Sequence, residues 1–347
     1  MKQTYTPKKR LRSCLINCIG LLLLFLFFYL LFSSGVLGSR TEYIKGIMTT
    51  SCFTIVIVAS LNLITGYMGE FSLGHAGFMS VGAYASAIIT TALENRGIPA
   101  FAMFLIALLS GGIAAGLTGF LVGIPALRLR GDYLAIVTVA FAEIIRVAFC
   151  NFKITGGGRT ISGIAKLSSF YWCFWTTVVC VAIMYMYVRS RFGRTIMAIR
   201  EDYIAAAASG INVTYYKVLT FTISAFFAGV GGAMYAHYMT AMIPTTFNFS
   251  YSAEFLTEVI IGGTGSLTGS IVGAAFLSAL PELMRKFASY RMLAYSVVLI
   301  IVMIFKPGGL FGTWEFSLTR ALDRLTGRVK PAAAAADKTV KGGSDNE

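Results

Sequence analysis

A serine and a histidine three residues apart are the residues of this sequence best suited to covalent chemistry. Ser72 and His75 would share one face of a helix, where an imidazole can activate a hydroxyl group as a nucleophile. However, the surrounding residues, Glu70 to Gly74, lack the first glycine of the G-x-S-x-G motif, and no third partner can be identified. We therefore expect a satisfied polar pair at a break in a helix rather than a hydrolytic site.

The element that must position this pair is a glycine-rich stretch, residues 62–87. Within it, glycines recur every three to five residues, and these are Gly66, Gly69, Gly74, Gly77 and Gly82. A helix that faces lipid avoids such a run, whereas the run suits helices that touch backbone to backbone or break beside a polar cavity. The stretch therefore indicates a helix break inside a membrane, after which the helix resumes to about Leu93.

A second glycine-broken segment, Ile261 to Ser270, echoes the first. Ser266-Leu267 matches Ser72-Leu73, and small residues follow closely in both places. Broken segments in two halves of a chain are the sequence signal of a transport site near the middle of the membrane. We predict that both segments border a translocation path, with these candidate residues: Gly69, Glu70, Ser72, Gly74, His75, Gly263, Gly265 and Ser266.

The composition is that of a membrane protein. Of the 347 residues, 56% are hydrophobic and 13% are charged, and the mean hydropathy is +0.74, whereas soluble domains carry about 25% charged residues. The apolar blocks are long, so the predicted fold class is all-α, a polytopic membrane helix bundle with about 8–10 transmembrane helices. The first block covers residues 14–32 and the last covers 293–305. The total number of apolar blocks is odd, whereas two ends on the cytoplasmic side require an even number of crossings. Either one glycine-broken block is therefore re-entrant, or one block splits into two crossings.

The formal charge of +14 follows from membrane topology. Basic residues gather before the first span, in the loop 189–217 and in the tail, and the positive-inside rule places all three in the cytoplasm. The predicted domains are a basic cytoplasmic leader (1–13), a transmembrane domain (14–312) and a cytoplasmic tail (313–347) with a disordered end. Nucleic acid is not expected as a partner. The scattered cysteines and the two histidines predict neither a metal site nor a bound cofactor.

Two opposite charges lie one turn apart on a predicted helix from Tyr133 to Cys150. Glu143 and Arg146 should form an intramembrane ion pair, because a lone charge at membrane depth costs about 3 kcal/mol. The pair could fix packing near the helix end, or it could take part in gating. Asp132 is expected to cap the start of the same helix.

The basic loop 189–217 contains a further helical pattern. We predict one helix on the cytoplasmic surface from about Thr195 to Ser209, ending at Gly210. It combines a charged cluster with a patch of alanines and is too polar to cross the membrane. Docking of a partner protein and an ordinary amphipathic loop are both consistent with this pattern.

Several segments, in order along residues 50–312, match a known pattern. They are Gly69-Glu70-Phe71-Ser72-Leu73-Gly74-His75-Ala76-Gly77-Phe78, Leu129 to Ala135, Ala142 to Arg146, Thr155-Gly156-Gly157, Ser190 to Arg194, Ala198 to Asp202, Ala205-Ala206, Gly210-Ile211-Asn212, Ile261 to Ser266 and Gly309-Leu310-Phe311-Gly312. Together they resemble the permease subunits of branched-chain amino acid ABC importers, in particular the larger of the two paired permeases. The leader and the tail lie outside the resemblance.

The resemblance implies a set of partners in a bacterial cytoplasmic (inner) membrane. These are a second homologous permease subunit, two cytoplasmic ATPase subunits, an external substrate-binding protein and the lipid bilayer. The chain has no Walker A motif, so ATP would be hydrolysed by the partner subunits and the chain is not an enzyme. A coupling helix in the loop 189–217 would contact the ATPases through Arg194, Arg200, Glu201, Asp202, Ala205, Ala206 and Gly210. Glu201 stands three residues earlier than the usual Glu-Ala-Ala spacing.

The expected function is therefore import of leucine, isoleucine and valine, with ATPase closure pushing on the coupling helix and opening a path along the broken segments. One alternative is a permease of the same family for urea or short amides. Another is a stand-alone ion-coupled carrier, for which the ionisable candidates are Glu70, His75, Glu143, Glu254 and Glu258. For the importer, Gly74→Leu or His75→Leu should impair transport while the complex still assembles.

Overall fold

The computed structural model describes residues 41–94, 97–129 and 131–283, together with isolated positions on either side. Residues 43–315 form one compact unit, and the two ends of the chain are assigned to a second. The predicted spans at 14–32 and 293–305, the leader and the tail lie wholly or largely outside the described residues.

Six helices of the described part are long and apolar enough to cross a membrane. They are α2 (Thr41–Asn62) with its π-helical continuation η2 (Leu63–Met68), α3 (His75–Leu93), α4 (Ala100–Ala126), α5 (Asp132–Asn151), α6 (Phe170–Arg189) and α9 (Val213–Met239). They fall on the apolar blocks of the sequence. The predicted polytopic membrane helix bundle is therefore confirmed.

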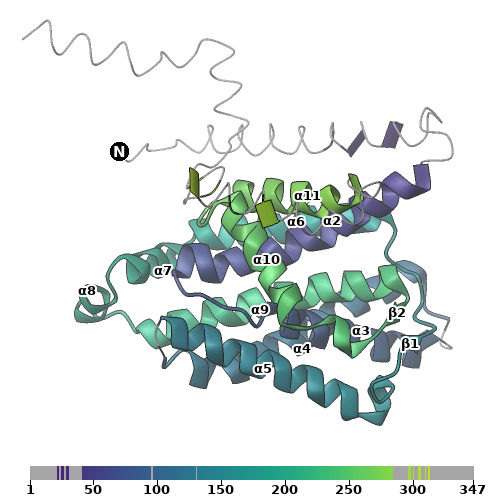
Figure 1. Cartoon of the computed structure of the whole chain (residues 1–347), viewed down its shortest axis with the longest axis horizontal. Coiled ribbons are helices and arrows are strands. Elements are labelled where there is room, and N and C mark those ends of the chain that lie inside the picture. Colours follow the sequence, from purple (N-terminus) through teal and green to yellow (C-terminus); the bar gives the residue numbers. More distant parts are fainter. Residues whose placement is uncertain are drawn as a thin grey trace, which may run out of the picture. The chain divides into compact units, whose positions relative to one another are not determined.

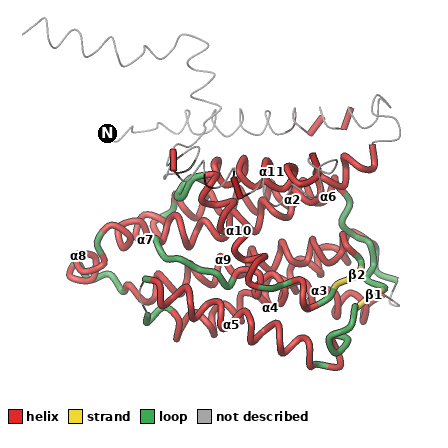
Figure 2. The backbone as a smooth tube through the Cα atoms, viewed as in Figure 1, coloured by secondary structure: helices red, strands yellow, loops and turns green. Residues whose placement is uncertain are grey.

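The shorter elements lie between and beyond these spans. Helices α7 (Arg191–Glu201) and α8 (Tyr203–Ala208) lie at one end of the bundle, and strands β1 (Ile161–Ser162) and β2 (Ala241–Met242) pair antiparallel at the other (Figure 1). The 3-10 turns η4 (Lys153–Thr155) and η5 (Pro244–Thr246) and the helices α10 (Phe249–Gly262) and α11 (Leu267–Leu283) complete the described part. Figure 2 shows that helix dominates, and that the connection from η2 to α3 is a loop running from beside α7 into the bundle.

Three helices cross at glycines in the core. A Cβ atom on Gly82 of α3 would lie 2.3 Å from the Cα of Gly229 in α9. A Cβ on Gly229 would lie 2.5 Å from the carbonyl oxygen of Gly111 in α4, and one on Gly111 would lie 2.7 Å from that of Gly82. Backbone therefore packs on backbone at all three contacts, as small residues allow inside a membrane.

The further glycines of α4 also face α9. A Cβ on Gly112 would meet the ring of Phe226, and one on Gly119 would lie 2.3 Å from the Cβ of Ala225. These glycines belong to two small-x-x-x-small repeats, Gly112-x-x-x-Gly116 and Gly119-x-x-x-Gly123, which thus serve close packing.

The coupling segment differs from its prediction. The single helix expected from Thr195 to Ser209 is two helices, α7 and α8, and the break falls at Asp202. Asp202 is extended (φ −152°, ψ 105°), and its carboxylate accepts hydrogen bonds from the backbone N–H groups of Ile204 and Ala205. An aspartate that caps a new helix competes with continuation of the preceding one.

The start of α5 also differs. Asp132 was expected to cap this helix, but it is the first residue inside it, and Gly131 occupies the capping position with φ 59°. No side chain caps α5 at its N-terminus. The Asp132 carboxylate still lies in the first turn, where a negative charge is favourable for the helix dipole.

Candidate functional site

The two glycine-broken segments meet in the structure. Helix η2 ends at Gly69 (φ 77°), and α10 ends at Gly263 (φ 123°) before α11 begins. A Cβ on Gly66 would lie 2.2 Å from the backbone nitrogen of Gly265, so the two backbones touch. We call these four glycines, Gly66, Gly69, Gly263 and Gly265, the glycine junction. Segments about 200 positions apart in the sequence thus form one contact.

Asn62 fastens the junction. Its Nδ2 donates to the carbonyl oxygen of Ser266 (2.9 Å) and to Oγ of Ser270 (2.7 Å), and its Oδ1 accepts from the backbone N–H of Gly265 (3.0 Å). The side chain is fully buried. The sequence analysis assigned Asn62 no role, although a buried-looking amide at the end of an apolar helix was the available signal.

Ser266 and the C-terminal glycines complete this contact. Oγ of Ser266 accepts from the backbone N–H of Gly269 (3.1 Å), which helps to cap α11. A Cβ on Gly309 would lie 2.5 Å from the Cα of Gly263, and a Cβ on Gly263 would lie 2.7 Å from the carbonyl oxygen of Gly312. Three separate motifs of the sequence therefore converge on one place.

Arg200 connects α7 to the junction. Its Nη1 donates to the carbonyl oxygen of Gly66 (2.6 Å), and Nη2 pairs with Glu201 (3.0 Å). A Cβ on Gly69 would lie 2.5 Å from Cγ of Arg200, so only glycine leaves room for the arginine stem. The last carbonyls of a helix lack intrahelical partners and carry partial negative charge, so a guanidinium is a suitable donor to one of them.

Glu70 pairs with a residue that the sequence analysis did not single out. Nζ of Lys217, in the first turns of α9, donates to Oε1 of Glu70. The two side chains are 13% and 12% exposed, respectively. This ion pair joins the loop after η2 to the N-terminal end of α9.

Ser72 and His75 do not form a nucleophile–base pair. Nε2 of His75 lies 2.9 Å from Oγ of Ser60, which donates its own proton to the carbonyl of Ile57 (2.7 Å). The Ser60 oxygen is then left to accept from His75 Nε2–H. Oγ of Ser72 is buried and has no hydrogen-bond partner among the described residues. The expected polar pair is thus His75 with Ser60 rather than with Ser72.

The loop before α3 packs on α5 and α10. A Cβ on Gly74 would lie 2.6 Å from the carbonyl oxygen of Thr138, and Oγ1 of Thr138 accepts from the N–H of Leu73 (3.2 Å). Oγ of Ser252 in α10 accepts from the N–H of Ala76 (3.0 Å), one of the N–H groups that a helix start leaves unpaired. Neighbouring helices therefore satisfy the polar backbone of this break.

The remaining coupling candidates lie on or just after α7 and α8, and most of them are exposed. Nη1 of Arg194 donates only to its local neighbour, the carbonyl of Arg189 (3.1 Å), and is exposed. Ala206 is buried, whereas Ala205 is exposed. Gly210 takes φ 83° after α8, as predicted for a glycine that ends a helix.

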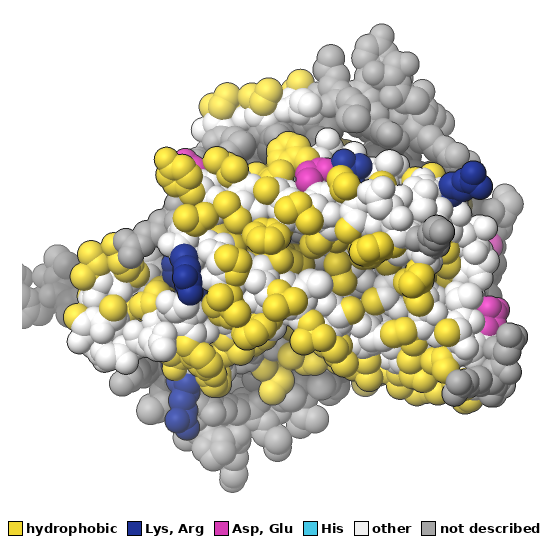
Figure 3. Space-filling view, turned by 90° about the horizontal axis from the view of Figure 1, so that it is seen from below, with side chains coloured by type: hydrophobic (Ala, Val, Ile, Leu, Met, Phe, Trp, Pro, Cys, Tyr) yellow, Lys and Arg dark blue, Asp and Glu magenta, His cyan; other side chains and the backbone are white. Residues whose placement is uncertain are grey.

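The predicted ion pair on α5 is present. Nε of Arg146 donates to Oε2 of Glu143 at 2.7 Å, and the side chains are 27% and 36% exposed. Only 17% of the most apolar stretch of α5 is buried inside the structure, whereas 78% of the corresponding stretch of α9 is buried. Figure 3 looks from the side on which α5 lies in Figure 1, and shows a mostly hydrophobic face with a few charged side chains.

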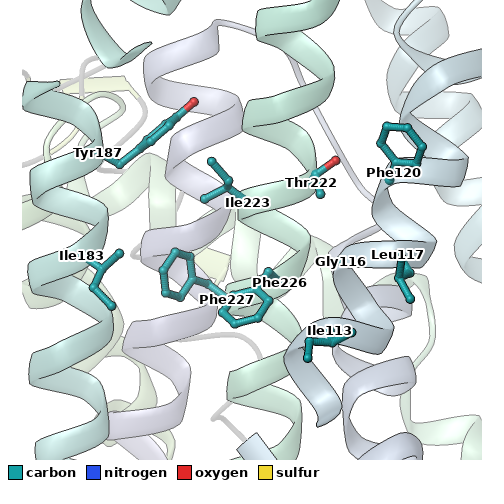
Figure 4. Close-up of a pocket in the computed structure, with 10 residues that line it drawn as sticks. All are labelled: Ile113, Gly116, Leu117, Phe120, Ile183, Tyr187, Thr222, Ile223, Phe226 and Phe227. Atoms are coloured by element: carbon teal, nitrogen blue, oxygen red, sulfur yellow. The ribbon is translucent and has the colours of Figure 1, made fainter. Parts of the chain in front are cut away.

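A hydrophobic groove of about 610 Å³ lies elsewhere, between α4, α6 and α9. Phe226 and Phe227 lie between the side chains of α4 and α6 (Figure 4). The hydroxyls of Tyr187 and Thr222 are already bonded to Thr220 and to the carbonyl of Val218. A charged amino acid would find no partner there, so the groove is not the path that the sequence predicts.

No group of three or more metal-ligating side chains occurs in the described part of the chain. Backbone contacts and paired charges hold the two broken segments together at the glycine junction. Such contacts can stabilise one conformation of these segments and break when the segments move.

Comparison with known proteins decides the family. Residues 43–306 match the permease component of branched-chain amino acid transport systems. The chain belongs to this family. The resemblance seen in the sequence is thereby confirmed, and the chain is a multi-pass membrane permease whose relatives are transport proteins rather than enzymes.

Individual relatives support this assignment. The permease is 34% identical over 299 residues to LivM of Salmonella typhimurium, named a high-affinity branched-chain amino acid transport system permease protein, with 76% of this chain and 69% of the relative covered. It is 23% identical over 298 residues to LivH of the same organism, covering 79% and 96%. Among solved structures, PsaBC from Streptococcus pneumoniae in complex with Fab is similar with a TM-score of 0.43 and 14% identity, covering 80% of this chain and 96% of that chain.

Proposed function

We propose that this permease forms, with a second homologous permease, the translocation path of an ABC importer for branched-chain amino acids. Two ATPase subunits hydrolyse ATP, and an external binding protein delivers the substrate. The observation that carries the proposal is the hydrogen bond from Arg200 of α7 to the carbonyl of Gly66, because it connects a surface helix pair directly to the glycine junction. The names of the relatives LivM and LivH support the substrate class.

The end of the bundle that carries α7 and α8 is proposed to face the ATPases in the cytoplasm. Arg194, Ala205 and Gly210 lie on its surface. The cytoplasmic (inner) membrane is proposed from the family, and the cytoplasmic position of both termini is supported by the basic clusters of the sequence under the positive-inside rule. The opposite end, with β1 and β2, would then face outward.

The second permease is proposed to lie along α5. A charged pair facing lipid is unfavourable, and Glu143 and Arg146 are only partly covered within this chain. A protein partner or a water-filled path between two permeases would solvate them. The predicted path residues Ser72, His75 and Ser266 are buried in this conformation, so we propose that the path at the glycine junction is closed here.

The stand-alone carrier receives less support from the geometry. Of its ionisable candidates, Glu70 is paired with Lys217, Glu143 with Arg146, and His75 with Ser60. Oε2 of the buried Glu258 lacks a hydrogen-bond partner among the described residues. Uptake by the purified chain alone in liposomes, driven by a proton or Na⁺ gradient, would favour a carrier.

The test of the importer is purification followed by reconstitution. The tagged permease is co-expressed with its neighbouring genes, and we expect a second permease and two ATPases to co-purify. In proteoliposomes with the binding protein present, labelled leucine should accumulate only when ATP is supplied on the side of the membrane that carries the ATPase subunits. Purification of the chain without any ATPase would contradict the proposal, and ATP-dependent uptake of urea in place of leucine would correct the substrate.

A further inference from the structure

We infer that Arg200 is a positioning residue that transmits movement of the α7–α8 helix pair to both glycine-broken segments, rather than a residue that docks the ATPase. This inference rests on the proposed function, and it names the residue that links movement of the ATPases to the translocation path. It starts from where the side chain of Arg200 goes. The guanidinium donates inward to the carbonyl of Gly66, 134 positions away, although α7 is a surface helix.

The stem of Arg200 is held as closely as its head. Its Cγ occupies the space where a side chain on Gly69 would stand, and Gly69 takes φ 77°, which favours glycine. Nη1 lies 3.4 Å from the place of a Cβ on Gly265. A displacement of α7 therefore acts on η2 at two points, and it is felt at the second broken segment as well.

The glycine junction then carries the displacement to α10 and α11. The backbones of Gly66 and Gly265 touch, and Asn62 bonds Gly265, Ser266 and Ser270 at once. Asn62, Ser266 and Ser270 are fully buried, so breaking their hydrogen bonds would leave the Asn62 amide without partners away from water. They behave as a fixed joint between the two broken segments.

The bond from Arg200 differs from this fixed joint. The side chain is 34% exposed, so water can replace Gly66 as its partner when the bond opens. Glu201, 73% exposed, holds the other end of the guanidinium at 3.0 Å. The bond from Arg200 to Gly66 can therefore break and re-form at low free-energy cost, whereas the contacts between the two broken segments stay intact. This combination suits a residue that transmits movement of α7 to both segments.

The exposed arginine on the same helix provides the matched control. Among the described residues, the Arg194 side chain bonds only to the carbonyl of Arg189 and contacts no residue of the glycine junction. If surface charge on α7 served mainly to dock the ATPase, loss of Arg194 should resemble loss of Arg200. If Arg200 acts through Gly66, the two losses should differ in kind.

The test compares Arg200→Ala, Arg200→Lys and Arg194→Ala in the full reconstituted complex. We measure co-purification of the ATPases, ATP hydrolysis, and leucine uptake from the binding protein in the same preparations. For Arg200→Ala we expect assembly and hydrolysis within twofold of wild type and uptake reduced about tenfold or more, the loss expected for one charged hydrogen bond. The ATP hydrolysed per leucine imported should therefore rise about tenfold.

Arg200→Lys keeps a positive charge but lacks the planar fork, so uptake should fall at least threefold with assembly retained. If Arg200→Ala does not fold, leucine uptake by Arg200→Lys tests the inference in its place. Loss of the ATPases from either Arg200 variant, or normal uptake by both, would overturn the inference. Failure of the wild-type chain to bind ATPases or to import leucine would instead contradict the proposed function, whatever the variants do.

Discussion

Glu70 and Lys217 form an ion pair across 147 positions of sequence, between the loop after η2 and the start of α9. Both side chains are nearly buried. Arg200 donates a hydrogen bond to Gly66 of the same broken segment, so two basic residues, one from α7 and one from α9, hold this segment. This relationship gives the break a fixed position despite its glycines.

Removing one partner of this pair should destabilise the permease strongly. Glu70→Gln and Lys217→Met each leave a charge with little access to water, and we expect a loss on the order of 3 kcal/mol in the free energy of unfolding. The double variant Glu70→Gln/Lys217→Met should lose less than the sum of the single variants, because no charge is stranded. Thermal unfolding of the detergent-purified complex measures this, and additive losses would show that the two residues do not interact.

Asn62 should be as important as any residue of the glycine junction. Asn62→Leu preserves size but leaves the backbone N–H of Gly265 without its partner, at about 1–3 kcal/mol, whereas the Ser266 carbonyl and the Ser270 hydroxyl keep their hydrogen bond to each other. We expect a sharp fall in the yield of folded complex and in its melting temperature. Asn151→Ala is the control, since this exposed residue bonds only to the Val147 carbonyl and should change stability by less than about 0.5 kcal/mol. Equal effects of the two substitutions would argue against the role of Asn62.

Two glycines of α4 should respond oppositely to alanine. In Gly111→Ala the new methyl group would lie 2.7 Å from a backbone oxygen of Gly82, which cannot move without shifting α3, so we expect about 1–3 kcal/mol of destabilisation. In Gly116→Ala the nearest atom is Cβ of Phe226 at 3.5 Å, an ordinary contact, so stability should be unchanged or slightly higher. Thermal unfolding of both variants distinguishes the cases, and similar behaviour would mean that the three-helix crossing tolerates a wider separation.

The two serines near His75 provide a test against covalent catalysis. Ser72→Ala removes a hydroxyl without a partner among the described residues, so transport and stability should be preserved, and a serine-reactive probe should not label Ser72. Ser60→Ala removes the partner of His75 and should cost about 1–3 kcal/mol. Labelling of Ser72 by the probe would revive the hydrolytic interpretation, whereas loss of uptake in Ser72→Ala without labelling would point to the translocation path.

The helices could be predicted from the sequence because apolar length and glycine spacing are local signals. The predicted helix from Tyr133 to Cys150, for example, closely anticipates α5 (Asp132–Asn151), and the predicted end at about Leu93 is that of α3. The break between α7 and α8 was missed because the alanine patch favours a continuous helix, whereas Asp202 gains two hydrogen bonds by ending one helix and capping the next.

The partners at the glycine junction could not be read from the sequence. That Arg200 turns inward, and that Lys217 reaches Glu70, depend on how α7 and α9 pack, which no local pattern encodes. The structure also changes one expectation: a side chain on Gly74 would collide with the Thr138 carbonyl, so Gly74→Leu should prevent assembly rather than impair transport alone. His75→Leu stays the better probe of transport.

Helix η2 has a consequence for comparing this permease with its relatives. A π-helical turn spaces its hydrogen bonds by five residues instead of four, so it accommodates one residue more than an α-helix of equal span. Deleting one residue within Leu63–Met68 would let the segment become a regular α-helix of the same span, and the residues beyond it would keep their facing. Gly69 and Glu70 would then still face Arg200 and Lys217. A relative that lacks one residue at this point of an alignment can therefore keep both contacts with an ordinary α-helical turn.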